Sequence, residues 1–363
     1  MSEPTIYNCH MHVFTTQNVP RLFLKMQFGP VWGPLLSGLM GLNWTRRFCV
    51  RVARGVYPLF RRDGFQRLAT MYSTGNLSSQ EKVFQVIQKQ YPAGTVFVAL
   101  AMNLQHAGLG PVPQHVDKQH ADLLALAQRS GGCLVPFYAA DPREPGLVEK
   151  VREAIGPGKF RGVKIYPNLG YYPNDKTLME VYAICQERDV PVMTHCSWGG
   201  MFHYGFKVAD RMRYSKPENY ESVLKAYPRL RLCLAHFGGN DEWDKHLTNQ
   251  TPHDGPHRAW VKWITDMLTL GHYPNLYTDI SYLAFQARSA ALHIDYVDYL
   301  KVLLSNPHIR ERVLFGSDFY AVEQELMTEK EVSITLRSHL GEALYFQMAN
   351  ENPRRYLGLE PST

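Results

Sequence analysis

Two histidines separated by one residue stand near the N-terminus, in the sequence His10-Met11-His12. They follow a short apolar stretch that predicts a β-strand, and side chains two residues apart on a strand point to the same face. Both imidazoles could therefore hold one metal ion. Taken alone, a His-x-His pair is weak evidence, because any strand can carry one.

Three further residues that can do chemistry end apolar stretches later in the chain. His195 ends VPVMTH, His236 ends LRLCLAH and Asp318 ends RVLFGSD. With 15 histidines in 363 residues, their occurrence at the ends of several predicted strands is not expected by chance. The C-terminal ends of strands carry the active sites of parallel barrels. The alternative is a set of buried structural histidines with a capping aspartate.

Eight short stretches rich in β-branched and aromatic residues predict the strands that position these side chains. Segments with helical character separate most of them, and such alternation predicts an α/β fold, a (β/α)₈ TIM barrel. A doubly wound open sheet is the competing fold, but no glycine-rich phosphate loop follows the first strand. The predicted strands are Thr5–His10, Thr95–Ala101, Gly132–Tyr138, Arg161–Tyr166, Val190–His195, Leu230–His236, Asn275–Ser281 and Arg312–Asp318.

The first predicted strand and the second are separated by a long helical insertion, residues 13–92. Connections of this length usually carry function or helices of their own. In a barrel the insertion would stand over the face where active sites form. We therefore expect one domain, residues 1–363, in which the insertion is a substrate-covering lid or an oligomerisation surface of a homodimer.

Composition and charge exclude several classes of protein. A hydrophobic share of 45% and a net charge of +6 describe an ordinary globular chain without a basic run for nucleic acid. The six cysteines show no paired spacing, and the N-terminus lacks the apolar core of a signal peptide, so we expect a reduced, cytoplasmic protein. Residues 26–45 are uncharged, but two prolines and four glycines argue against a transmembrane helix.

The order His-x-His, His, His, Asp resembles the amidohydrolase superfamily. The strings GVKIYP, VMTHCS, LAHFGG, YTDIS and VLFGSDF are similar to its amidohydrolase-related branch, amidohydrolase-2. The resemblance runs from Tyr7 to about Tyr356 and excludes the insertion. That branch contains hydrolases of carboxylated rings or lactones, and also aromatic acid decarboxylases. The motifs are specific for the superfamily and say little about the substrate.

The resemblance implies roles for the five residues. His10, His12, His195 and Asp318 resemble the ligands of one divalent metal, with an open position for water. Zinc is the first expectation for such ligands, and manganese or iron would be tolerated. His236 resembles the histidine that works as acid or base beside the metal, and Asp318 could also accept a proton from the attacking water.

Three other residues are candidates for substrate binding. Lys164 lies on the fourth predicted strand, where two-metal members of the superfamily carry a carbamylated lysine. Because GVKIYP is typical of the one-metal branch, we expect Lys164 to pair with a substrate carboxylate or a neighbouring acid. Asp279 could bind substrate or orient His236, and otherwise be a polar residue of the barrel interior. Trp198 lies in a glycine-rich loop suited to lining a pocket for an apolar or aromatic group.

The leading hypothesis is a metal-dependent hydrolase of a small amide, ester or lactone whose substrate is carboxylated or aromatic. The second is a non-oxidative decarboxylase of an aromatic or unsaturated acid on the same metal site. A metal-free lactonase is a third. In a different class, the chain would be a catalytically inactive binding protein whose insertion serves as a docking surface.

Overall fold

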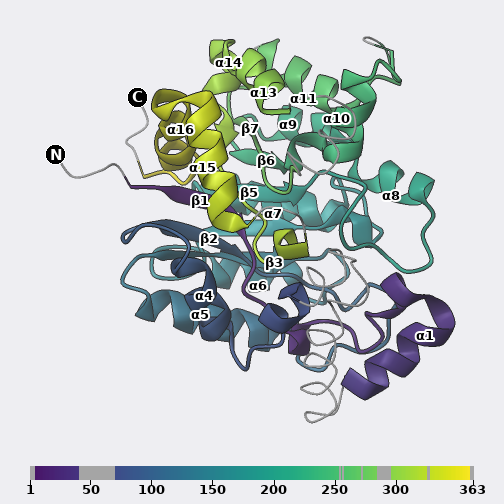
Figure 1. Ribbon diagram of the computed structural model, residues 1–363. Coiled ribbons are helices and arrows are strands. Elements are labelled where there is room, and N and C mark those ends of the chain that lie inside the picture. The colour runs from purple at the N-terminus through teal and green to yellow at the C-terminus, as the bar shows by residue number, and fades with distance from the viewer. Residues whose placement is uncertain are drawn as a thin grey trace, which may run out of the picture.

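Eight parallel strands form the centre of the molecule in the computed structural model (Figure 1). The structure describes residues 5–40, 70–252, 255, 257–270, 273–283, 296–324 and 328–359. Each strand pairs with the next in chain order, which confirms the predicted TIM barrel. The strands are β1 (Tyr7–Met11), β2 (Val96–Leu100), β3 (Leu134–Ala140), β4 (Gly162–Ile165), β5 (Val192–His195), β6 (Leu232–Ala235), β7 (Leu276–Asp279) and β8 (Val313–Leu314).

The helices that follow the strands surround them. Figure 1 shows α4 and α5 beside β2, and α11 and α13 on the opposite side near β6 and β7. The helices are α1 (Lys25–Met40), α4 (Gln80–Gln88), α5 (Val116–Arg129), α6 (Leu147–Ala154), α7 (Lys176–Glu187), α8 (Val208–Ser215), α9 (Glu221–Ala226), α10 (Asn240–Leu247), α11 (Trp260–Thr269), α13 (Tyr296–Leu304), α14 (Pro307–Arg310), α15 (Glu329–Leu340), α16 (Glu342–Phe346) and α17 (Asn352–Tyr356). Within the described residues, none of these helices has the length and apolarity to cross a membrane.

The last strand meets the first through backbone hydrogen bonds. Cys9 N–H donates to Phe315 O over 2.8 Å, and Met11 forms a parallel bridge with Phe319. The pairing of β1 with β2 shifts register between Asn8 and Met11. A bulge of this kind re-aims the side chains that follow it. Cys9 contributes to the cluster that fills the barrel, whereas His10 and His12 line the pocket above it.

The insertion of residues 13–92 divides into parts with different surroundings, and residues 41–69 lie outside the described chain. Helix α4 at its end is a barrel helix, because Val83 and Ile87 are fully buried in the core. Helix α1 near its start instead exposes Val31 and Trp32. The described residues ahead of α4, 13–40 and 70–79, are therefore the part that can stand over the barrel mouth.

The strands are shorter than their sequence patterns suggest, and several site residues lie just beyond them. His236 and Asp318 follow β6 and β8 with φ angles of 67° and 64°, and Tyr282 has a φ of 54°. Residues other than glycine rarely adopt this left-handed conformation, and where they do they cluster at functional sites. All three line one pocket.

Gly162 leaves room for an aromatic ring inside the barrel. Gly162 of β4 pairs with Phe137 of β3, and a Cβ atom built on Gly162 would lie 2.2 Å from Phe137 Cζ. Phe137 is fully buried among the side chains that fill the barrel, so its ring has little space to retreat.

Gly162→Ala is expected to destabilise the protein by about 1–3 kcal/mol, because it overpacks the barrel interior. Urea unfolding followed by circular dichroism measures the effect. Adding Phe137→Leu to Gly162→Ala should recover part of the loss. An unchanged unfolding midpoint for the single variant would contradict this account of the packing between Gly162 and Phe137.

Candidate metal centre

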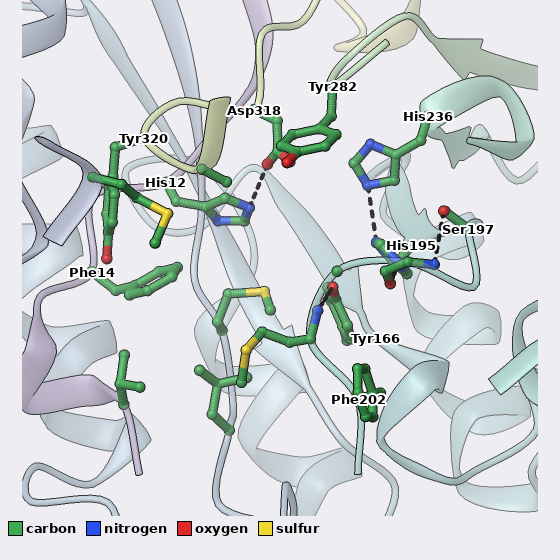
Figure 2. A pocket seen from close by; sticks show the side chains of 18 of the residues that line it. His12, Phe14, Tyr166, His195, Ser197, Phe202, His236, Tyr282, Asp318 and Tyr320 are labelled. Atoms are coloured by element: carbon green, nitrogen blue, oxygen red, sulfur yellow. Dashed lines mark hydrogen bonds and ion pairs between the residues drawn. The ribbon is translucent and has the colours of Figure 1, made fainter. Parts of the chain in front are cut away.

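His10, His12 and Asp318 converge where β1 and β8 end. Each offers a ligand atom, and these atoms lie within 4.8 Å of one another. Asp318 Oδ1 is 3.1 Å from His12 Nε2 and 3.5 Å from His10 Nε2. Figure 2 shows the His12 ring and the Asp318 carboxylate next to each other, joined by a dashed line. The structure therefore brings together three of the four residues expected to bind the metal.

Hydrogen bonds set which nitrogen of each imidazole is available. His10 Nδ1–H donates to Asp279 Oδ2 over 2.8 Å, and His12 Nδ1–H donates to Leu100 O over 2.9 Å. A neutral imidazole then carries its lone pair on Nε2, the arrangement typical of metal-ligating histidines. His10 Nε2 is buried and has no hydrogen-bond partner. The free Nε2 lone pairs of His10 and His12, together with the Asp318 carboxylate, are ligand atoms that fit a divalent cation.

His195, the fourth expected ligand, lies beside His236 and outside the group of three. His195 Nδ1 is 2.9 Å from His236 Nε2, and His195 Nε2–H donates to Gly199 O over 3.1 Å. Figure 2 shows this pair across the pocket from His12. With its Nε2 committed to Gly199, His195 would offer Nδ1 to a metal. The role of His195 as a ligand stays a prediction.

Asp279 is a fully buried hydrogen-bonding centre rather than part of the pocket wall. Besides the His10 ring it accepts from the backbone N–H groups of His236 at 2.9 Å and Ser281 at 3.0 Å. It thus orients the His10 ring and the backbone of His236. The ring of His236 contacts Ser281 instead, with 2.9 Å between Nδ1 and the Ser281 hydroxyl.

The electrostatics keep the imidazoles of His10, His195 and His236 neutral and the Asp318 carboxylate ionised. Burial, with a smaller contribution from the charge of Lys164, lowers the pKa of His10 to about 3. Burial also lowers the pKa of His195 and of His236. Burial alone would raise the pKa of Asp318, but its hydrogen bond to His12 and its electrostatic interactions with His10, His12 and His236 lower it to about 2. Metal ligation requires these protonation states.

A pocket of about 420 Å³ opens above the three converging residues. Its wall is mainly apolar, and among the described residues that line it there is no lysine or arginine. The segment before α4 supplies a large part of this wall: Phe14, Thr16, Val19, Phe23, Met26, Met71, Tyr72 and Gly75. His195 and His236 line the same pocket. Apolar walls around a few polar groups are typical of small-molecule sites.

Two expected substrate contacts lie outside this wall. Lys164 is buried and lines a separate, much smaller cavity. Trp198 donates its indole N–H to Glu242 over 3.2 Å, while Met201 and Phe202 of the same loop line the pocket. The roles of Lys164 and Trp198 in substrate binding remain predictions.

Asn8 and Ser281 have positioning roles that the sequence analysis missed. Asn8 Nδ2 donates to Ser317 Oγ over 2.8 Å, and Asn8 Oδ1 accepts from Ser317 N–H at 3.2 Å. Asn8 therefore ties the strand of His10 to the segment of Asp318. A polar residue inside an apolar strand, two positions before His10, is the signal that could have pointed to it. Ser281 stands two residues after Asp279, in the motif YTDIS.

The family model described as amidohydrolase matches residues 88–359. The chain belongs to the amidohydrolase family. This confirms the resemblance found in the sequence motifs. A curated relative, a dihydroorotase from Acinetobacter baylyi, is 26% identical over 107 residues, which cover 28% of this amidohydrolase and 29% of the relative. The aligned stretch thus spans less than a third of the dihydroorotase.

Solved structures share the barrel fold of this chain. A dihydroxybenzoic acid decarboxylase from Polaromonas sp. JS666, with bound manganese and an inhibitor, is 13% identical with a TM-score of 0.56, covering 99% of this chain and 98% of that one. A probable 2-pyrone-4,6-dicarboxylic acid hydrolase from Acinetobacter baumannii is 12% identical with a TM-score of 0.55, covering 98% and 99%. Such low identities establish the fold alone.

The purified protein is expected to hold about one equivalent of a divalent metal, which His12→Ala and Asp318→Asn should abolish. Asp279→Asn should weaken metal binding by about 10–100-fold, because it disturbs the partner of the His10 ring. Elemental analysis after dialysis against buffered metal measures both effects. Tyr320→Phe, which alters the pocket wall and no candidate ligand, is the matched control. Full metal content in Asp318→Asn would contradict the proposed ligand set.

Proposed function

We propose that this amidohydrolase is a metal-dependent hydrolase of a small amide, ester or lactone with an apolar or aromatic body. The observation that carries the proposal is the pair of imidazoles, His10 and His12, whose Nε2 atoms face Asp318 at the floor of an apolar pocket. A bound divalent metal, with zinc expected first and manganese or iron tolerated, would activate water and polarise a carbonyl. His195 would complete the ligand set.

The residues around the metal site would move the protons of hydrolysis. Asp318, ionised in its surroundings, would accept a proton from the attacking water. His236 Nε2 faces His195, and the His236 ring lies beside that of His10, with 4.8 Å between ring centroids. The proton that Asp318 takes from water would pass to His236 and from there to the departing nitrogen or oxygen. The lowered pKa of His236 keeps its imidazole neutral until it receives that proton.

The first part of the insertion would act as the substrate-covering wall. Its apolar side chains face the metal site, where they exclude water and bind an apolar body. A homodimer that uses the exposed face of α1, where Val31 and Trp32 lie, is compatible with this role. The homodimer and the cytoplasmic location are further predictions.

Decarboxylation of an aromatic or unsaturated acid is the second candidate. Phe14, Phe202, Tyr282 and Tyr320 line the pocket and would surround an aromatic ring. The Polaromonas protein of the same fold is named a dihydroxybenzoic acid decarboxylase. Hydrolysis takes precedence because the structure offers both a proton acceptor, Asp318, and a separate histidine for the leaving group.

The metal-loaded enzyme is incubated separately with aryl esters, lactones, anilides and hydroxybenzoates. It should release an acid from the first three classes. Chromatography measures the acid, and a carbon dioxide assay measures decarboxylation. His236→Asn should lower kcat by about 10²–10⁴-fold, because it removes general acid catalysis, with metal content preserved. His339→Asn, a change at an exposed histidine, is the control. Carbon dioxide release from hydroxybenzoates without hydrolysis of any ester, lactone or anilide would contradict the hydrolase proposal and support the decarboxylase.

Phe23→Ala is expected to raise KM for an apolar substrate by roughly tenfold with little change in kcat, because it removes binding that substrate and transition state share. Phe23 lines the pocket and packs against Tyr72, with 6.0 Å between ring centroids. Steady-state kinetics on the best ester measures the effect. Val31→Ala, on the exposed face of α1, should leave KM unchanged. Equal KM values for Phe23→Ala and wild type would argue against a substrate-covering role.

A further inference from the structure

A buried carboxyl group lies next to the seam between β1 and β8 and outside the wall of the large pocket. It belongs to Glu329, the first residue of α15, which is 2% exposed. Glutamate is rarely buried to this extent unless other groups pair with it. The partners of Glu329 therefore indicate what the carboxyl group holds in place.

Two side-chain donors converge on one oxygen of this carboxyl group. The Tyr91 hydroxyl donates to Glu329 Oε1 over 3.1 Å, and Asn8 Nδ2 donates to the same oxygen over 3.3 Å. Both donors are buried as well. Glu329 Oε2 is also buried and has no hydrogen-bond partner in the described part of the chain. The carboxyl group thus joins α15 to β1 and to the segment that leads into β2.

Asn8 connects this carboxyl group with the candidate metal ligands. Its amide nitrogen also donates to Ser317 Oγ over 2.8 Å. Its Oδ1 accepts from the backbone N–H groups of Ser317 at 3.2 Å and His10 at 3.3 Å. Ser317 directly precedes Asp318 in the chain. The Asn8 amide is therefore held by Glu329 on one side, and on the other it binds the backbone that carries His10 and Asp318.

The charge of Glu329 acts on the same centre. Burial raises the pKa of Glu329 to about 7. The titratable and hydroxyl groups that face it come from neighbouring segments: Tyr91, Ser317, Asp318, Glu323 and Tyr345. Hydrogen bonds from Ser317 and Tyr91 favour the carboxylate, and the negative charges of Glu323 and Asp318 oppose it. A cation beside Asp318 would offset this repulsion, so cation binding and ionisation of Glu329 would favour each other.

We propose that Glu329 is a positioning residue of the metal centre, which sets the approach of His10 and Asp318 through Asn8 and Ser317. This assignment rests on the metal-dependent function proposed above. Glu329 touches neither candidate ligand. It acts by orienting the groups that hold them, and partners of this kind influence metal affinity strongly. A purely structural role would stabilise the fold and leave metal affinity unchanged.

Glu329→Gln tests the role, because it removes the charge and keeps the size of the side chain. Zinc affinity, measured by competition with a chromophoric chelator, should fall by about tenfold or more at pH 8. The difference from wild type should be smaller at pH 6, where Glu329 of the wild type is mostly protonated. Glu342→Gln, which changes an exposed carboxyl group paired with Arg337 of α15, should leave zinc affinity unchanged at both pH values.

Amide hydrogen exchange of the metal-free protein gives a second readout. Asp318 N–H, which donates to His10 O, and Cys9 N–H, which donates to Phe315 O, report on the seam. Glu329→Leu should speed their exchange by about fivefold or more relative to Val192 N–H of β5, because it removes a buried acceptor beside the seam. Equal acceleration at all three amides would indicate only a general loss of stability.

Equal zinc affinity of wild type and Glu329→Gln at pH 8 would overturn the positioning role. So would a loss of the same size at pH 6 and pH 8, or exchange that accelerates equally at the seam and at Val192. If Glu329→Leu does not fold by circular dichroism, exchange is measured on Glu329→Gln. A protein that binds no zinc would contradict the metal-dependent function, and the exchange comparison would still decide whether Glu329 holds the seam.

Discussion

The closure of the barrel between β1 and β8 is the interaction on which the rest of the site depends. Asp318 N–H donates to His10 O over 2.8 Å, so one backbone hydrogen bond joins two of the three converging residues. Gly316 makes this approach possible, since a Cβ atom there would lie 2.7 Å from His10 Cβ. The side chain of Asn8, on the same strand as His10, adds hydrogen bonds to Ser317, the residue before Asp318. A metal site built across this seam requires a closed barrel, which couples metal binding to folding.

Burial is the main influence on the protonation states of the site's histidines and carboxylates. Desolvation keeps His10, His195 and His236 neutral. Asp279 keeps its charge because the His10 ring and the backbone N–H of His236 donate to it. Burial by itself would raise the pKa of Asp279, but the interactions with His10 and His236 bring it below its usual range. One buried carboxylate thus fixes the tautomer of a candidate ligand and the position of a candidate acid.

The sequence was sufficient for the features that depend on local pattern. The eight strands, their order and the convergence of His10, His12 and Asp318 follow from apolar periodicity and from the shared edge of parallel strands. The bulge of β1 was not predictable, because it depends on contacts with residues such as Ser317, 309 positions away. The pairing of His195 with His236 likewise accompanies left-handed backbone at His236 and Phe237, and residues other than glycine carry no local signal for that conformation.

The distribution of charge in the site bears on the choice between hydrolysis and decarboxylation. A carboxylate that is to be lost must lie next to the reacting carbon, and so beside His10, His12 and Asp318. Lys164 lines a separate small cavity, but its charge lowers the pKa of His10 and is itself opposed by Asp279 and Asp318, so it acts on the same site. An anionic substrate group at this site would be attracted both by a bound metal and by Lys164. Hydrolysis and decarboxylation therefore make the same demand on the charges around His10, and the reaction products are what distinguish them.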